Sequence, residues 1–413
     1  MKKLMSEPGR ITRTEDRAKA PTDRHYAIVT ETYPPEINGV ALTVRNLANG
    51  LRARGHRVTV IRPRQAADGQ PGNDPATGQN MTPDITVPGM KLPRYPGLQF
   101  GLPAGGKLRR LWREQPPDAI YVATEGPLGW SAVNTARQLG IPVATGLHTR
   151  FDEYTRDYGL GFLQGIAFAW MRWFHNRANA TLVPTGELAA FLSARGFRQA
   201  VHLPRAVDPQ RFSPTHRDAQ LRQQWGLADD DLAVIYVGRI AAEKNLGLAV
   251  RAFRAIQTHQ PRARFIWVGE GPQRAALAEA NPDFIFCGLQ LHQALATHFA
   301  SGDLFLFPSR SETFGNVTLE AMASGVATVA FDYGAAREHL RNGLHGAAVD
   351  TDEAFVEAAV TLARQPQQRQ HQGRAASAAM QRLHPDQVAA NFDALLNGLG
   401  ARRTAREEVS PCN

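Results

Sequence analysis

The chain has 413 residues, a formal net charge of +9, 43% hydrophobic residues and 21% charged residues. This length provides for two or more domains, each with a full hydrophobic core, which excludes a small scaffold held together by disulfides. The composition is that of a folded protein and excludes an intrinsically disordered chain. The two cysteines, Cys287 and Cys412, match no metal-ligand spacing, which excludes a zinc ribbon and indicates a reducing compartment.

The first half of the chain alternates short β-branched runs with helical patterns. Strands are predicted at residues 26–30, 57–61, 119–123, 142–146 and 180–184. The first two strands flank a predicted helix at 41–54, in which Leu47 and Leu51 have helical spacing. This order is a βαβ unit, which predicts a parallel sheet with helices on its faces.

The same alternation begins again after Pro209. Strands are predicted at residues 233–237, 264–268, 283–286, 304–307 and 326–331, and helices at 246–257, 272–280, 291–300 and 317–323. We therefore expect an α/β fold of two doubly wound, Rossmann-like domains in tandem. The link between them is predicted where Asp208, Pro209 and Pro214 interrupt the periodicity.

The chain divides into five predicted segments. They are a polar, basic, disordered leader at residues 1–24, a first domain at 25–207, a second domain at 208–385, a C-terminal helix at 386–400 that packs back toward the first domain, and a disordered tail at 401–413. The leader begins with Met1, Lys2 and Lys3 but lacks the apolar stretch of a signal peptide. We therefore expect a cytoplasmic protein.

The positive charge belongs to the first half of the chain. Residues 1–210 contain 27 Lys and Arg against 17 Asp and Glu, whereas residues 211–413 contain 20 against 21. A basic half-molecule attracts a polyanion, either nucleic acid or an anionic membrane surface, and charge alone does not distinguish the two. No run of about 18 apolar residues is present, so no predicted helix spans a bilayer.

Ligands of open parallel sheets bind outside the carboxyl ends of the strands, so the loops that follow strands hold the candidate site. After the strand at 304–307, a polar loop leads into a helix whose first N–H groups have no partner within the helix. These donors lie on or beside Phe314, Gly315, Asn316 and Val317. Glu312 in the loop and Glu320 in the helix either accept hydrogen bonds from paired hydroxyls or simply complement the helix dipole.

A second loop follows the strand at 233–237. Arg239 comes directly after this strand, and Lys244 lies near the start of the next helix. Two cations and a helix N-terminus suit a diphosphate and would neutralise it as a leaving group. The alternative is a pair of solvated surface cations, although the position at a strand end favours binding.

Two further candidates follow strands of the first domain. Gly39 allows close approach of the backbone to a ligand directly before a helix, and its surroundings lack the Gly-x-Gly-x-x-Gly pattern of a hydride-transfer enzyme. His148 lies two residues after the end of the strand at 142–146. A lone histidine is more often structural, but a strand end between two domains is a place where ligands bind.

Together these motifs resemble one family. The matching segments are Pro35 with Asn38-Gly39-Val40, Gly238-Arg239 with Lys244-Asn245, Gly269-Glu270-Gly271-Pro272, and Glu312-x7-Glu320. Their order and spacing are similar to those of the retaining glycosyltransferases of family 4, whose GT-B fold places two Rossmann-like domains across a cleft. The resemblance covers about residues 26–399. The segment with His148, Phe151 and Tyr154 looks most like the GDP-mannose-dependent α-mannosyltransferases and related glycolipid glycosyltransferases.

The resemblance implies transfer of a hexose, best matched by mannose, from a nucleotide-diphosphate sugar to a lipid or glycan acceptor, with retention and without a metal or cofactor. Arg239 and Lys244 would bind the diphosphate and stabilise its growing negative charge. Gly39 would let the N-terminal loop close on the phosphate. His148 would contact the donor sugar near the reacting carbon.

The resemblance also implies contacts for the rest of the donor. Glu320 would hold the ribose hydroxyls and Glu312 the donor sugar. The backbone positions implied are Phe314, Gly315 and Asn316 for the sugar, and Gly288 and Leu289 for the base. The three aspartates at 229–231 precede a strand and are interpreted as a solvated turn, not a cation site.

Family acceptors are often lipids, which would explain a basic first domain. The segment 105–114 mixes cations with Leu108 and Trp112, as suits an anionic interface or an ordinary surface helix. The segment 162–174, with Trp170 and Trp173, is interpreted as a mostly buried helix. We therefore expect peripheral association with the inner face of the cytoplasmic membrane.

Three alternatives stay open. A UDP-sugar-dependent enzyme, using glucose, galactose or glucuronate to build a diacylglycerol glycolipid or lipopolysaccharide, would share these motifs. A nucleic-acid-binding protein is disfavoured, because the basic residues are spread over several helices without a recognised motif, so nucleic acid is not an expected partner. A nucleotide-sugar epimerase or glycan phosphorylase could use the same fold. The sequence does not indicate the oligomeric state.

Overall fold

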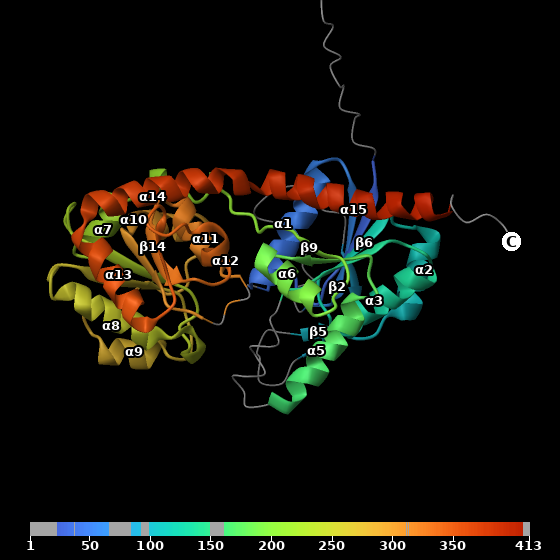
Figure 1. The fold of residues 1–413 in the computed structure, drawn as a ribbon, viewed down its shortest axis with the longest axis horizontal. Helices are drawn as coiled ribbons and strands as arrows, with labels where there is room; N and C mark the ends of the chain where they lie inside the picture. Colours follow the sequence, from blue (N-terminus) through green and yellow to red (C-terminus); the bar gives the residue numbers. More distant parts are fainter. Residues whose placement is uncertain are drawn as a thin grey trace, which may run out of the picture.

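The structure is a computed structural model that describes residues 23–407 apart from residues 37, 66–83, 92–98, 149–160, 311 and 313. It contains two α/β domains side by side, each built on a parallel sheet flanked by helices (Figure 1). Residues 1–22 of the predicted leader and 408–413 of the predicted tail lie outside the described residues. None of the helices in the described part is both long and apolar enough to cross a membrane.

The first domain is built on a sheet of seven strands in the order β3-β2-β1-β6-β7-β8-β9, with neighbours paired in parallel. Its elements are β1 (His25–Val29), α1 (Gly39–Ala53), β2 (Arg57–Pro63), β3 (Ile85–Val87), β4 (Gly89–Lys91), β5 (Gln99–Gly101), α2 (Gly105–Glu114), β6 (Ala119–Val122), α3 (Pro127–Gln138), β7 (Val143–Gly146), α5 (Gly161–His175), β8 (Ala180–Val183), α6 (Gly186–Ala194) and β9 (Ala200–His202). β4 and β5 form a separate antiparallel pair.

The second domain has a parallel sheet of six strands in the order β12-β11-β10-β13-β14-β15. Its elements are η1 (Pro214–His216), α7 (Ala219–Gln224), β10 (Ala233–Val237), η2 (Ala242–Lys244), α8 (Leu246–Gln257), β11 (Arg264–Val268), α9 (Arg274–Ala280), β12 (Ile285–Phe286), α10 (His292–Ser301), β13 (Leu304–Phe307), α11 (Asn316–Ala323), β14 (Ala327–Phe331), α12 (Ala335–His339), β15 (Gly346–Val349), α13 (Asp352–Arg364), α14 (Pro366–Met380) and η3 (Gln381–Leu383). The chain ends in α15 (Pro385–Glu407).

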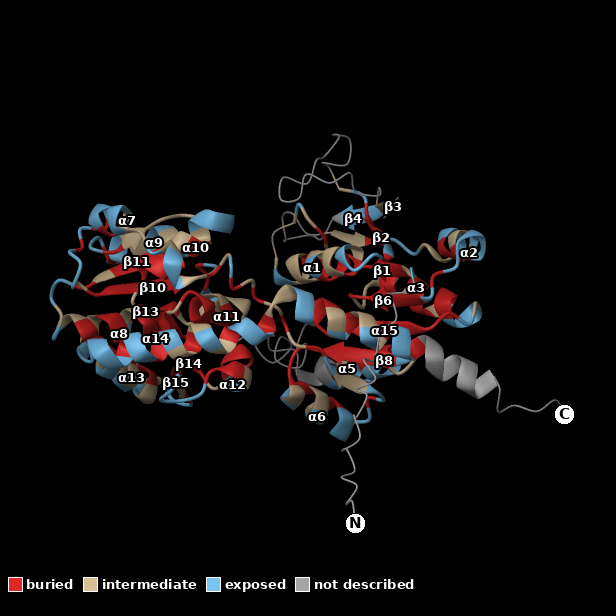
Figure 2. Ribbon diagram, turned by 90° about the horizontal axis from the view of Figure 1, so that it is seen from above, coloured by how far each residue is buried: buried red, intermediate tan, exposed pale blue. Residues whose placement is uncertain are grey.

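The predicted fold of two doubly wound domains is confirmed. β10, α8, β11 and β13 match their predicted ranges residue for residue, and most of the other predicted elements differ by one or two residues at an end. The central strands are buried along their whole length (Figure 2), as expected for parallel sheets covered on both faces. β3, β4 and β5 were missed, because strands of three residues are too short to show an alternation.

Each sheet has a point where the strand order reverses. In the first domain this switch point lies between β1 and β6, and in the second between β10 and β13. Helices after neighbouring strands lie on opposite faces there, which leaves a crevice at the carboxyl ends of the two strands. The loops after β1, β10 and β13 are therefore the places where the fold favours a ligand.

The C-terminal helix α15 returns to the first domain. Together with α14 it forms a helical band that runs along both domains (Figure 1). The hydroxyl of Tyr26 on β1 donates to Asp393 at 2.8 Å, and Phe392 packs edge-on against Tyr121 at 5.1 Å between ring centroids. The prediction of a disordered tail from residue 401 is wrong as far as Glu407, because 401–407 are mostly Ala, Arg and Glu, which favour helix.

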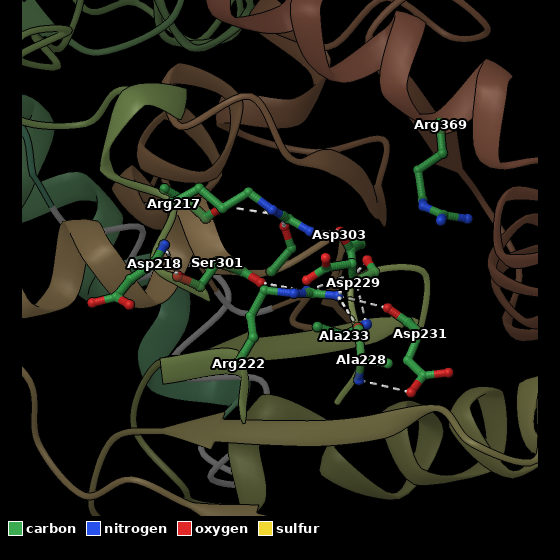
Figure 3. Close-up of polar contacts among 12 residues, drawn as sticks. Arg217, Asp218, Arg222, Ala228, Asp229, Asp231, Ala233, Ser301, Asp303 and Arg369 are labelled. Atoms are coloured by element: carbon green, nitrogen blue, oxygen red, sulfur yellow. Dashed lines mark hydrogen bonds and ion pairs between the residues drawn. The ribbon is translucent and has the colours of Figure 1, made fainter. Parts of the chain in front are cut away.

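A buried charge network fixes the segment that follows the inter-domain link (Figure 3). Arg222 on α7 donates to Asp303 at 3.0 Å and to the carbonyl of Asp231 at 2.7 Å. The Asp231 carboxylate, 7% exposed, pairs with Arg262 at 2.9 Å. The interpretation of 229–231 as a solvated turn is therefore wrong for Asp231, because the arginines that pair with its backbone and side chain come from other segments.

Candidate active site

Loops at the carboxyl ends of β10 and β11 are bonded directly to each other. The amide of Ile240 donates to the carbonyl of Glu270 at 2.9 Å. A Cβ on Gly269 would lie 2.0 Å from the carbonyl oxygen of Gly238, and one on Gly271 would lie 2.2 Å from that of Ile240. Side chains do not fit at these distances, so the two glycines are required for the loops to pack together. The motif Gly269-Glu270-Gly271 thus holds the loop after β11 against the loop after β10, which carries Arg239 and Lys244.

The structure brings together two predicted site residues, Lys244 and Glu312. The Lys244 Nζ lies 2.6 Å from Glu312 Oε1, which also accepts a hydrogen bond from Ser309 Oγ at 2.9 Å. Lys244 follows β10 and Glu312 follows β13, so the ion pair spans the switch point of the second sheet. An ammonium has three donors, and those not used by Glu312 are available to a ligand.

Arg239 has a different environment from Lys244. Its side chain is 61% exposed and lies 3.5 Å from the carboxylate of Glu243, one turn away. An exposed pair of this kind contributes little to stability and leaves the guanidinium free to turn toward a ligand. The shared role of Arg239 and Lys244 on one diphosphate stays a prediction.

The start of α11 faces the start of α1 across the two domains. Gly315 adopts φ +87 at the N-cap and offers no side chain to the first N–H groups of α11. A Cβ placed on Gly39 would lie 3.6 Å from Asn316 Nδ2, so the N-termini of the two helices are neighbours. Asn316 Oδ1 is buried and has no hydrogen-bond partner among the residues that the structure describes. Both helix ends attract negative charge, which makes the space between them suitable for phosphate.

The loop before α11 is anchored by Phe314. Its side chain is buried and packs edge-on against His339, and its carbonyl accepts a hydrogen bond from Ala335 N at 2.7 Å. Val317 lies at the edge of the same core. These contacts hold the first turn of α11 in place, so the N–H groups predicted to meet the donor sugar are fixed before any ligand arrives.

The predicted base contacts lie after β12. Gly288 adopts φ +67 and its carbonyl accepts from Gly269 N at 2.8 Å, which joins this segment to the loop after β11. Leu289 is 54% exposed. An exposed apolar side chain beside a backbone turn is suited to cover a flat base, but the contact itself stays a prediction.

His148 is part of a buried polar chain. Its Nδ1 accepts from the Arg205 guanidinium at 2.6 Å, and its Nε2 lies 2.9 Å from the hydroxyl of Tyr121. Because a guanidinium only donates, Nδ1 carries no proton and Nε2–H donates to the Tyr121 oxygen. Burial, and then the positive charge of Arg205, hold the pKa of His148 well below its ordinary value. The ring is therefore neutral, and with both nitrogens engaged it is not a free general base.

Tyr121 and Arg205 were missed in the sequence. Tyr121 is hidden within an ordinary apolar strand, β6. Arg205 could have been identified from the sequence, because it is a single cation in the apolar segment 203–207 near the link between the domains. Its side chain is buried, which lowers its pKa to about 10, and no carboxylate pairs with it within the described chain. A guanidinium buried without an anion indicates a functional position.

Glu320 is the second predicted carboxylate and lies in α11. Burial raises its pKa to about 7, against the opposing effect of the Arg211 charge. Raising the pH from 6 to 8 therefore converts Glu320 from mostly protonated to mostly ionised. The ionised carboxylate is the stronger acceptor for two ribose hydroxyls, so we expect the affinity for GDP to rise by up to about tenfold over this range. Titration calorimetry at several pH values measures this change in affinity. A Glu320→Gln variant with an equally steep pH dependence would contradict the assignment.

Comparison with known proteins identifies the chain. Residues 37–211 match the model described as Glycosyltransferase Family 4, and residues 231–365 match that of Glycosyl transferases group 1. A GDP-mannose-dependent alpha-mannosyltransferase of Mycobacterium tuberculosis is 34% identical over 317 residues, 76% of this chain and 80% of the relative. The chain belongs to glycosyltransferase family 4. The predicted family and the hexosyltransferase class are thereby confirmed.

Two other proteins resemble this glycosyltransferase. An alpha-monoglucosyldiacylglycerol synthase of Acholeplasma laidlawii is 27% identical over 322 residues, 73% of this chain and 79% of the relative. The solved sucrose-phosphate synthase of Thermosynechococcus elongatus superposes with a TM-score of 0.70 at 19% identity, covering 92% of this chain and all of that one. The structural likeness shows the fold and confirms the predicted GT-B architecture.

Proposed function

We propose that this glycosyltransferase transfers mannose from GDP-mannose to a lipid or glycan acceptor at a membrane surface, with retention of configuration and without a metal. The observation that carries the proposal is the Lys244–Glu312 pair at the switch point of the second sheet, close to the open N-terminus of α11. A cation and free N–H donors together suit the diphosphate of a nucleotide sugar. The mannosyl donor is supported by the name of the relative at 34% identity.

The geometry supports a mechanism based on charge and position. Lys244 would stabilise the negative charge that grows on the diphosphate as the glycosidic bond breaks, and the N-termini of α1 and α11 would add to this from two sides. Glu312 would hold the ammonium and accept from a sugar hydroxyl. His148 is neutral and its buried ring would form a wall beside the donor sugar, not a proton acceptor. The acceptor oxygen would attack from the face that the diphosphate leaves, and its proton would pass to the departing diphosphate oxygen.

A thermal-shift panel tests the donor. We expect GDP-mannose to raise the melting temperature, and UDP-glucose, UDP-galactose and UDP-glucuronate to have little effect, because a ligand of the native state stabilises it by about 2.7 kcal/mol at 100 times its Kd. Stabilisation by a UDP-sugar alone would favour the UDP-dependent glycolipid synthase instead. The anomeric configuration of the product, read by NMR, tests retention.

A further inference from the structure

One face of α5 is apolar and exposed. Ile166, Trp170 and Trp173 are 66%, 43% and 48% exposed, and their spacing of four and three residues places them on one side of the helix. Beside these residues, the helix packs into the domain through Met171 and Phe174. The expectation that this segment is mostly buried is therefore wrong for these three side chains, which we name the α5 face.

The aromatic rings of the α5 face are held in position. Trp173 stacks on Trp130 at 4.6 Å between centroids, and Trp170 stacks on Phe174 at 5.6 Å. The Arg177 guanidinium lies 5.2 Å from the Trp130 ring and 5.1 Å from the Trp173 ring. Rings that are already ordered lose little conformational entropy when they bind. Tryptophan is also the side chain most enriched where hydrocarbon meets lipid headgroups.

Cations lie near the α5 face, and the Arg177 guanidinium is in contact with the Trp173 ring. The sequence contains no Asp or Glu between Asp157 and Glu187. A basic rim is made of two pairs of arginines. Arg172 donates to the Arg195 carbonyl at 3.2 Å, and Arg137 donates to the Arg177 carbonyl at 2.9 Å. Exposed aromatic residues with cations beside them match an anionic membrane interface.

α2, the other helix considered for an interface, has a different arrangement. Of the three apolar residues that suggested insertion, Leu108 and Trp112 are 0% and 2% exposed and belong to the core, and Leu111 is partly buried against it. The outer side of α2 offers mainly cations together with Glu114. Two of these cations are bonded within the domain, Lys107 to the Thr86 carbonyl and Arg109 to Gln138. The interpretation that the apolar residues of α2 lie at an anionic interface is therefore wrong, and the alternative of an ordinary surface helix describes α2 better.

We propose that the α5 face docks the first domain on an anionic phospholipid bilayer. Ile166, Trp170 and Trp173 enter the headgroup region, and the basic rim binds lipid phosphates. A second copy of the chain is a poorer occupant, because a symmetric contact through this face would set one basic rim against another. The inference rests on the proposed function, since a membrane-bound acceptor requires the domain that carries His148 to reach the lipid surface.

Vesicle binding tests the docking surface. The full chain is mixed, without nucleotide sugar, with vesicles of phosphatidylcholine alone or of phosphatidylcholine and phosphatidylglycerol in equal parts. We expect co-sedimentation with the anionic vesicles only. An Ile166→Ser, Trp170→Ser double variant should bind them at least about tenfold more weakly, because it loses two half-exposed apolar side chains. Arg172→Gln should weaken binding by about fivefold. Quenching of tryptophan fluorescence by brominated lipid reports insertion directly.

A matched control keeps the experiment decisive. Leu344→Ser removes an apolar side chain that is 40% exposed on the second domain and should leave vesicle binding unchanged. Undiminished binding of the double variant, or equal binding to neutral vesicles, would overturn the proposal. Sedimentation velocity showing a dimer that the double variant abolishes would assign the face to a second copy instead. Because the vesicle assay contains no donor, its outcome is independent of whether GDP-mannose stabilises the protein.

Discussion

Lys244→Ala is expected to lower kcat/KM for sugar transfer by about 10²–10³-fold, the loss typical when a donor to a developing charge is removed. The ammonium lies 2.6 Å from Glu312 and spans the switch point between β10 and β13, where the diphosphate is expected. The two side chains keep 16% and 21% of their surface exposed, so Glu312 can be hydrated after the truncation. The free energy of unfolding should therefore change little, and the lost rate is a loss of charge stabilisation.

Steady-state transfer assays and thermal melts measure this result together. Glu312→Ala should lose most activity as well, and the double variant should lose less than the two single losses combined, because the residues act as a pair. Arg262→Ala is the matched control, since it removes a cation whose side chain is 77% exposed and pairs with Asp231, away from the switch point. Near-normal turnover of a folded Lys244→Ala enzyme would contradict the assignment of Lys244 to the active site.

The strands of the second domain could be predicted because each is a continuous apolar run bounded by polar turns. β10 and β13 are buried at every residue, and their composition alone indicates a parallel sheet. The pairing of Lys244 with Glu312 could not be predicted with the same ease, because 68 residues separate them and their contact depends on β10 and β13 being neighbours. The loops were identifiable as candidates, but the ion pair between them required the strand order.

A comparison of α2 with α5 shows a second limit of what the sequence can predict. Trp112 on α2 is 2% exposed and Trp170 on α5 is 43% exposed, although both lie among apolar neighbours. Periodicity identifies the apolar side of α2, which lies against the domain. α5 is apolar on several sides, so its sequence does not specify which side is covered. Only the way α5 packs on the domain leaves Ile166, Trp170 and Trp173 between 43% and 66% exposed, although Trp173 stacks on Trp130 and Trp170 stacks on Phe174.

Arg205→Met is expected to lower kcat by about 10²-fold with little change in the KM for the donor, because a displaced active-site wall affects the reaction more than binding. Methionine is an unbranched apolar side chain that is shorter than arginine. The substitution removes a buried unpaired charge, so the variant should fold with similar or greater stability. Without the guanidinium, His148 Nδ1 loses its donor, and nothing fixes the tautomer. Arg205 thus acts as a positioning residue through His148.

The pH dependence of the same variant separates positioning from a merely structural role. The Arg205 charge lowers the pKa of His148, so its removal should raise that pKa toward the ordinary value. The acid limb of the pH–activity profile should therefore move to higher pH in the variant, while burial, the larger cause, still holds the pKa of His148 below its ordinary value. Arg205→Lys keeps the charge and should restore the acid limb of the profile in part. The nitrogen-15 shifts of His148 report the tautomer directly, and an unchanged tautomer and pH profile in Arg205→Met would show that Arg205 does not act through His148.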